Sequence, residues 1–169
     1  MQHILITGAN RGLGFEFSRQ YLERGAQVFA GCRQPPAAIS LRTLQAKYPQ
    51  RLSIMALDVG DADAIRAAHD TVHAQTDSID ILVNNAGIYS SHGSDEPLER
   101  LGKLSFEDAL MLLRVNAVAP LLVAQQFMGL LRAARGAKLI NISSGYGSVS
   151  ANTGGFPYYY SASKAALNM

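Results

Sequence analysis

The stretch that decides the fold is His3-Ile4-Leu5-Ile6-Thr7-Gly8-Ala9-Asn10-Arg11-Gly12-Leu13-Gly14. The apolar run over residues 3–7, bounded by Gly8, is typical of a buried β-strand. Apolar residues then recur at helical spacing from Leu13 to Glu23, and Gly25 ends that helix. Glycines at such a junction let backbone N–H groups approach a pyrophosphate at the positive end of the helix. The turn alone is also consistent with a purely structural role, but its place after a first strand favours phosphate binding.

Strand and helix patterns alternate along the rest of the chain. The further predicted elements are strands over 28–30, 52–57, 80–84 and 138–142, helices over 37–48 and from Asp61 onward, and a long helical region over 105–135. Continuous apolar strands separated by helices indicate a parallel sheet covered on both faces. The predicted fold class is α/β, a doubly wound, Rossmann-like sheet within one domain over residues 1–169.

The long helical region and the loop before it carry three local signals. Ser105 and Asp108 have the spacing of a helix cap. Pro120 is expected to bend the helix or to split it in two, because proline removes a backbone donor and its ring clashes with the preceding turn. Residues 87–104 are polar without a clear period, and we expect a mobile loop there.

Composition excludes several classes of protein. With 169 residues, 48% of them hydrophobic and 17% charged, the chain is neither disordered nor a linker. A net charge of +2 gives no electrostatic case for binding nucleic acid or an anionic membrane, and no apolar run is long enough to span one. Cys32 is the only cysteine and His69 with His73 the only metal-like spacing, so we expect no disulfide and no metal site. These features, with a strand pattern starting at His3, predict a cytoplasmic protein without a signal peptide.

Tyr160 and Lys164 form the strongest chemical signal. Residues four apart share one face of a helix, so the phenol and the ammonium are expected side by side. A free phenol, with a pKa of about 10, is a poor base at neutral pH, and a nearby ammonium favours its phenolate form. The pair therefore predicts an acid–base catalyst. The alternative is that Tyr160 is one more aromatic residue after Tyr158 and Tyr159, which we assign to pocket walls or packing.

The end of the second predicted strand bears on the choice of cofactor. A site for NAD usually has an acidic residue there for the ribose hydroxyls, whereas NADP needs positive charge for its 2′-phosphate. This chain has Cys32 followed by Arg33, and Arg11 in the glycine turn adds a second cation. The two arginines favour NADP(H), unless both are merely solvated surface residues.

Motifs along essentially the whole chain resemble, in the same order, those of the short-chain dehydrogenase/reductase family. They are Gly-x-x-x-Gly-x-Gly over residues 8–14, Asn84-Asn85-Ala86-Gly87, Val115-Asn116-Ala117, Asn141-Ile142-Ser143-Ser144 and Tyr160-x-x-x-Lys164. Within the family, Ala9 to Gly14 and Gly31-Cys32-Arg33 resemble the C-factor and carbonyl-reductase branch. The resemblance implies an oxidoreductase that transfers a hydride between a nicotinamide and a small-molecule carbonyl or alcohol.

The resemblance also implies a role for each matching residue. Tyr160 would move the proton, Lys164 would support it and hold the nicotinamide ribose, and Ser144 would orient the carbonyl, with Ser143 as runner-up. Asn116 would support the proton relay, although a polar residue on the helix surface is the simpler reading. The implied cofactor-binding residues are Gly8, Asn10, Arg11, Gly12, Leu13, Gly14, Arg33, Asp58, Val59, Asn85, Ala86 and Gly87, together with Tyr160 and Lys164.

Some of these assignments leave alternatives open. Asp58 and Val59 match the family's adenine-contacting pair, but Asp58 fits equally a cap for the next helix. Asn84 and Asn85 are as well explained by bonding backbone groups at the strand end as by cofactor contact. The segment from Ser144 to Tyr160 is longer than is common in the family.

The chain ends five residues after Lys164, whereas family members continue with further strands and a segment that covers the substrate. We therefore expect an incomplete domain that lacks the C-terminal strands, with the fifth strand at the edge of the sheet. This expectation leaves a second hypothesis open, a non-catalytic or impaired nucleotide-binding fragment or regulatory module. Homo-oligomers are possible through Leu121, Leu122 and Leu130, which would serve equally as core residues.

Overall fold

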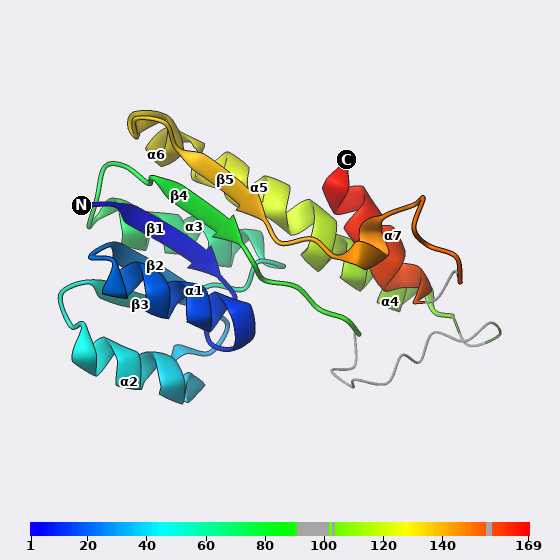
Figure 1. Ribbon diagram of the computed structural model, residues 1–169, viewed down its shortest axis with the longest axis horizontal. Coiled ribbons are helices and arrows are strands. Elements are labelled where there is room, and N and C mark those ends of the chain that lie inside the picture. Colours follow the sequence, from blue (N-terminus) through cyan, green and yellow to red (C-terminus); the bar gives the residue numbers. More distant parts are fainter. Residues whose placement is uncertain (91–101, 103, 155–156) are drawn as a thin grey trace. The chain divides into compact units, whose positions relative to one another are not determined.

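A computed structural model describes residues 1–90, 102, 104–154 and 157–169 (Figure 1). Its residues group into two compact units, which we call the sheet unit (1–86 and 122–141) and the helical unit (87–121 and 142–169). The predicted loop over 87–104 lies partly outside the described residues, because 91–101 and 103 are among those not described. Each unit is described by itself below.

The sheet unit is built on five parallel strands in the order β3-β2-β1-β4-β5. Their bounds are His3–Thr7 (β1), Gln27–Cys32 (β2), Leu52–Ala56 (β3), Ile81–Asn84 (β4) and Lys138–Asn141 (β5). The central strand β1 pairs with β2 from His3↔Gln27 to Thr7↔Gly31, and with β4 from Ile4↔Ile81 to Ile6↔Val83. Side chains of β1 and β2 such as Ile4, Leu5 and Phe29 are fully buried, because a parallel sheet is covered on both faces. The predicted fold class is confirmed.

Helices lie on both faces of this sheet. Helices α1 (Gly12–Glu23) and α2 (Ile39–Lys47) cover one face, and α3 (Ala62–His73) lies on the other (Figure 1). The switch of face follows from right-handed crossovers, since the chain moves outward from β1 to β3 and then returns past β1 to β4. On the second face, the His69 ring of α3 packs edge-on against Phe127, with ring centroids 5.4 Å apart.

Several predicted boundaries shift by a few residues. Strand β2 extends the predicted 28–30 to Cys32, and α2 begins only at Ile39 because the two prolines at 35 and 36 form a short 3-10 turn first (η1, Pro35–Ala37). Helix α3 begins where expected: Asp61 is its N-cap and accepts hydrogen bonds from the N–H groups of Asp63 (2.8 Å) and Ala64 (3.4 Å).

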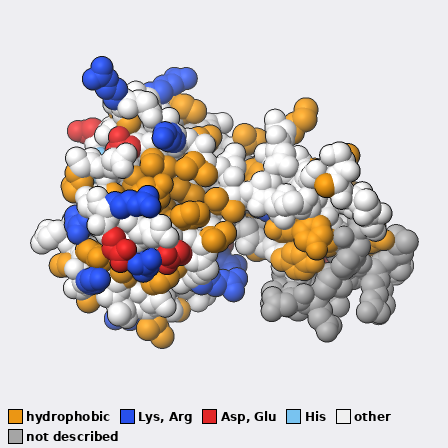
Figure 2. Space-filling model, viewed as in Figure 1, with side chains coloured by type: hydrophobic (Ala, Val, Ile, Leu, Met, Phe, Trp, Pro, Cys, Tyr) orange, Lys and Arg blue, Asp and Glu red, His pale blue; other side chains and the backbone are white. Residues whose placement is uncertain are grey.

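Strand β5 forms the edge of the described sheet, and all four of its residues are exposed. The exposed apolar side chains of the sheet unit include Leu13, Leu139 and Ile140. On the face of the sheet unit that Figure 2 shows, hydrophobic side chains gather near the middle, and lysines and arginines are spread among acidic and polar side chains. Within the described residues, no helix has the length and apolar character that crossing a membrane requires.

The long helical region is interrupted, as Pro120 predicts, and it contains a π-helical turn that the sequence pattern does not indicate. Helix α4 (Phe106–Leu113) is capped by Ser105, whose Oγ accepts from the Asp108 N–H at 3.1 Å. A π-helical turn follows (η2, Arg114–Val118), and then α5 (Ala119–Gln126) and α6 (Met128–Ala133), which are separated at Phe127. Pro120 has no N–H for the carbonyl of Asn116, and widening the preceding turn relieves the clash of its ring.

The rest of the helical unit consists of the turn η3 (Gly145–Gly147) and helix α7 (Tyr158–Asn168). Helix α7 packs against α4, η2 and η3, so residues from distant parts of the sequence meet around it. This packing assembles the candidate site of the helical unit.

Candidate functional site

The glycine turn has the geometry of an anion site at the start of a helix. Gly8 and Gly12 adopt φ of +64° and +55°, which residues with a Cβ rarely adopt, and a Cβ on Gly14 would collide with Asn85. Helix α1 has no side-chain cap and no acidic residue in its first turn. Its first N–H groups and its positive end therefore suit a phosphate, as the sequence predicts.

Asn85 fastens this turn to the end of β4. Its Nδ2 donates to the carbonyls of Thr7 (2.9 Å) and Gly8 (3.0 Å). The Thr7 hydroxyl accepts from the backbone N–H groups of Asn85 and Ala86, both at 3.0 Å. The Asn85 amide therefore makes the contacts with backbone groups that the structural alternative expected, and these contacts fix the shape of the glycine turn.

Arg33 is the first exposed residue after β2, and Arg11 is exposed beside the glycine turn. Cys32, which stands where an NAD site usually has its acidic residue, is 2% exposed, and burial raises the pKa of its thiol. The group offered to solvent at the end of β2 is therefore a guanidinium.

Asp58 does not cap α3, so this alternative was wrong. Its Oδ1 accepts from the N–H of Gly60 at 2.9 Å in a local turn, and the cap is Asp61, three residues later. Val59 beside it is buried.

Tyr160 and Lys164 lie on one face of α7. The Lys164 side chain is 5% exposed, and its Nζ lies 5.9 Å from the centroid of the Tyr160 ring. Nζ donates to the carbonyl of Ile142 at 2.8 Å, which anchors the ammonium to the segment after β5. Burial lowers the pKa of Lys164, because the charged form loses its hydration.

Asn116 is fully buried, which removes the reading of a helix-surface residue. Its Oδ1 accepts from the Ile88 N–H and its Nδ2 donates to the Ile88 carbonyl, both at 2.8 Å. Nδ2 also donates to Ser163 Oγ at 3.0 Å, and that hydroxyl donates to the Tyr160 carbonyl at 2.8 Å. Asn116 therefore joins the π-helical turn, the segment after β4 and helix α7.

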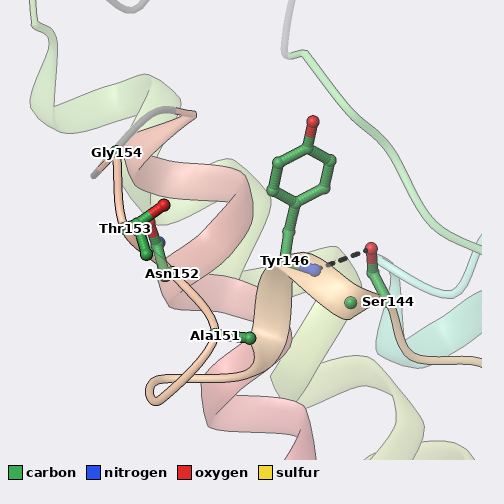
Figure 3. Close-up of a pocket in the computed structure, with 7 residues that line it drawn as sticks. Ser144, Tyr146, Ala151, Asn152, Thr153 and Gly154 are labelled. Atoms are coloured by element: carbon green, nitrogen blue, oxygen red, sulfur yellow. Dashed lines mark hydrogen bonds between the residues drawn. The ribbon is translucent and has the colours of Figure 1, made fainter.

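The two candidate serines have different surroundings. The Ser143 hydroxyl donates to Asn168 Oδ1 at 2.6 Å, whereas Ser144 lines a cavity of about 490 Å³. Ser144 Oγ accepts from the Tyr146 N–H at 3.3 Å, which leaves its own hydrogen to donate. Figure 3 shows the Ser144 hydroxyl and the Tyr146 ring projecting from η3 in the same direction.

Residues that the sequence analysis did not single out support this arrangement. Asn168 Nδ2 donates to the Gly147 carbonyl at 3.1 Å, and a Cβ on Gly147 would lie 2.8 Å from the backbone of Lys164. The Tyr160 ring contacts the rings of Tyr89 (centroids 4.9 Å apart) and Tyr146 (6.1 Å). No sequence signal marks these residues, because each contact joins segments distant along the chain.

The predicted site residues divide by unit. The helical unit contains Asn116, Ser144, Tyr160, Lys164 and Gly87, whereas the other predicted cofactor residues lie in the sheet unit, namely Gly8, Asn10, Arg11, Gly12, Leu13, Gly14, Arg33, Asp58, Val59, Asn85 and Ala86.

Two other groups of residues bear on metal binding and assembly. Of the leucines considered for assembly, Leu121 (71%) and Leu122 (41%) are exposed, while Leu130 is buried. The described residues include no group of three or more side chains able to hold a metal ion.

Comparison with known proteins identifies the family. The family model for short chain dehydrogenases matches residues 2–169, and the chain belongs to this family. A short-chain dehydrogenase of Penicillium roqueforti (anuI) is 31% identical over 98% of this chain and 68% of its own length. Human 17-beta-hydroxysteroid dehydrogenase type 6 is 33% identical over 92% of this chain and 46% of its own length.

Solved structures of carbonyl reductases are also similar. The NADPH-bound carbonyl reductase from chicken fatty liver is 34% identical, with a TM-score of 0.87 over 100% of this chain and 71% of that one. A carbonyl reductase from Pseudomonas aeruginosa PAO1 in complex with NADP is 32% identical, with a TM-score of 0.88 over 99% of this chain and 72% of that one. The chain thus spans about half to three quarters of the length of these relatives, and the resemblance noted from the motifs is confirmed.

Proposed function

We propose that this chain is an NADP(H)-dependent oxidoreductase that interconverts a small-molecule carbonyl compound and its alcohol. The observation that carries the proposal is the Lys164 ammonium, buried and anchored 5.9 Å from the Tyr160 ring. The family and the NADP-bound relatives support the same reaction class.

The sheet unit supplies the phosphate site. The N-terminal N–H groups of α1 would bind the pyrophosphate, and the space beside Gly12, where a Cβ would meet no atom within 4 Å, leaves room for it. Gly8 and Gly14 let the turn pack closely against Ala86 and Asn85. The guanidinium groups of Arg11 and Arg33 would pair with the 2′-phosphate. Bound NADPH would supply the hydride that reaches the carbonyl carbon.

The helical unit supplies the proton. The Tyr160 hydroxyl gives its proton to the carbonyl oxygen, so hydride and proton together turn C=O into CH–OH. The Lys164 ammonium stabilises the phenolate that remains, and the Ser144 hydroxyl donates a hydrogen bond to the carbonyl oxygen. Asn116 supports the return of a proton. The backbone carbonyl of Asn116, to which Pro120 has no N–H to donate, is our candidate to hold a relay water.

The test is the substitution Tyr160→Phe, which removes one oxygen and keeps the ring. We expect turnover of carbonyl substrates with NADPH, followed by absorbance, to fall at least about 100-fold, the low end for general acid catalysis. NADPH binding, measured by calorimetry, should stay within about twofold, because the phosphate site has lost nothing.

The matched control is Tyr159→Phe, which makes the same change one residue away on α7. Wild-type turnover by the Tyr160→Phe variant would refute the assignment. A wild-type chain that binds NADPH but oxidises none of it with any aldehyde or ketone would favour the non-catalytic module instead.

A further inference from the structure

Tyr146 links the cavity of the helical unit to Tyr160. It lines the cavity of about 490 Å³ together with Ser144, Gly145 and residues 151–154. Tyr160 covers part of the Tyr146 ring, because the two rings meet at 73° with centroids 6.1 Å apart. The rest of the Tyr146 side chain is open, since the residue is 51% exposed.

The Tyr160 ring contacts both Tyr89 and Tyr146, and this row of ring contacts reaches the cavity through Tyr146. Tyr89 and Tyr160 are half-buried with centroids 4.9 Å apart, whereas Tyr146 is exposed. Aromatic rings attract one another in tilted and edge-on arrangements at such separations. A ring carried by a ligand in the cavity would therefore extend the row.

The remaining lining favours a neutral ligand. Gly145, Ala151 and Gly154 are small, and Ser144 and Thr153 carry hydroxyl groups that can donate hydrogen bonds. Figure 3 shows Ser144, Ala151, Thr153 and Gly154 around the cavity. The described residues that line the cavity include no charged side chain. Its volume falls in the range of roughly 300–1,000 Å³ that is usual for small-molecule sites.

Resting on the proposed function, we propose that the substrates are neutral carbonyl compounds with an aromatic ring beside the carbonyl group, and that Tyr146 selects them. The substrate ring packs on Tyr146 while its carbonyl oxygen faces the Ser144 hydroxyl. The reaction is balanced as above, since an aryl aldehyde gains a hydride at carbon and a proton at oxygen to give a benzylic alcohol.

The experiment compares benzaldehyde with cyclohexanecarbaldehyde, whose ring has the same number of carbons but no π-system. For each aldehyde, kcat and KM are measured with NADPH for wild type, Tyr146→Leu, Tyr146→Phe and the remote control Tyr48→Leu. We expect Tyr146→Leu to reduce the preference for benzaldehyde about three- to tenfold, the value of one aromatic contact, mainly through KM. Tyr146→Phe and Tyr48→Leu should keep the preference.

Failure of this inference differs from failure of the proposed function. If Tyr146→Leu lowers the turnover of both aldehydes equally, the selection by Tyr146 is refuted while the oxidoreductase stands. If wild type reduces neither aldehyde, the wider panel of aldehydes and ketones decides the proposed function, and binding of benzyl alcohol and cyclohexylmethanol, measured by saturation-transfer NMR, decides this inference. A benzyl alcohol signal lost only in Tyr146→Leu would support the aromatic site, and equal signals for both alcohols would overturn it.

Discussion

Lys164 keeps an ammonium group where water has little access. Its side chain is 5% exposed, and the Ile142 carbonyl accepts from Nζ at 2.8 Å. The Ile142 carbonyl, a neutral acceptor, replaces only part of the hydration that the charge loses, and burial lowers the pKa of this lysine. A lysine held in this way is costly for stability, which agrees with a role in chemistry rather than in packing.

This burial predicts a dependence of stability on pH. Because the pKa of Lys164 is lower in the folded than in the unfolded chain, the unfolded chain binds more protons as pH approaches about 10.4, the ordinary lysine value. The contribution of Lys164 to stability should therefore be largest above that pH and be lost as pH falls through the folded pKa. We expect the free energy of unfolding of wild type, relative to Lys164→Met, to rise between pH 7 and pH 10.

Urea unfolding of both proteins at each pH measures this difference. Groups that they share, such as the buried Cys32 thiol, cancel in the comparison. A difference that stays constant over the whole range would show that burial does not perturb this lysine.

For single residues, the spacing in the sequence predicted the contacts that lie within one helical turn. Tyr160 and Lys164 share a face because four residues make about one helical turn. The contact of Asn168 with Ser143 spans 25 positions, and no periodicity reports such a pair. The same limit kept Ser143 as runner-up to Ser144 in the sequence analysis, since the partner of each hydroxyl cannot be read from the sequence.

Turn η3 fixes Ser144 and Tyr146 against helix α7 through a glycine. The backbone of Lys164 lies so close to Gly147 that an added Cβ would be 2.8 Å from it, whereas a Cβ on Gly145 would meet no atom within 4 Å. The two glycines thus differ in packing although they belong to the same short turn.

This difference predicts unequal effects of the same substitution. Gly147→Ala should destabilise the protein by about 1–3 kcal/mol, the usual cost of overpacking, and should lower kcat because η3 must move. The matched variant Gly145→Ala should stay within about 0.5 kcal/mol of wild type. Thermal unfolding with steady-state kinetics tests both, and equal losses in the two variants would argue against the close contact.

At the scale of elements, strands and helices were predictable because each has its own apolar period. Their ends were less so: the prolines of η1 delay α2, and the π-helical turn before Pro120 is a response of the backbone rather than a pattern in the side chains. The cap at Ser105 was predicted because its partner lies three residues away.

At the scale of the molecule, the two kinds of chemistry belong to different units. The sheet unit holds the glycine turn and both arginines, and the helical unit holds the residues proposed for proton transfer. The alternation of strands and helices predicted the sheet, but which distant segments cluster into units depends on packing that alternation does not encode.

The preference for NADPH over NADH should be visible in the thermal stability of the chain. We expect saturating NADPH to raise the melting temperature more than NADH does, because a ligand that binds only the folded state stabilises it in proportion to its affinity. Arg33→Asp should weaken NADPH binding about tenfold or more and remove the preference, since a charge-assisted hydrogen bond becomes a repulsion.

The control is Arg24→Asp, which makes the same change in charge after the C-terminal end of α1, away from the glycine turn. Differential scanning fluorimetry with each cofactor gives the comparison. Equal shifts for NADPH and NADH in wild type would remove the basis for assigning Arg33 to the 2′-phosphate.

The π-helical turn at Arg114–Val118 also determines the angular phase of helix α5, which follows it directly. Each residue of an α-helix advances the chain by about 100° around the axis, so one residue fewer in this turn would rotate α5 by that amount relative to α4. Val123 of α5, which is now buried, would then no longer face its present neighbours. Insertions and deletions should be tolerated far less here than in surface loops, although a sequence alignment would score them alike.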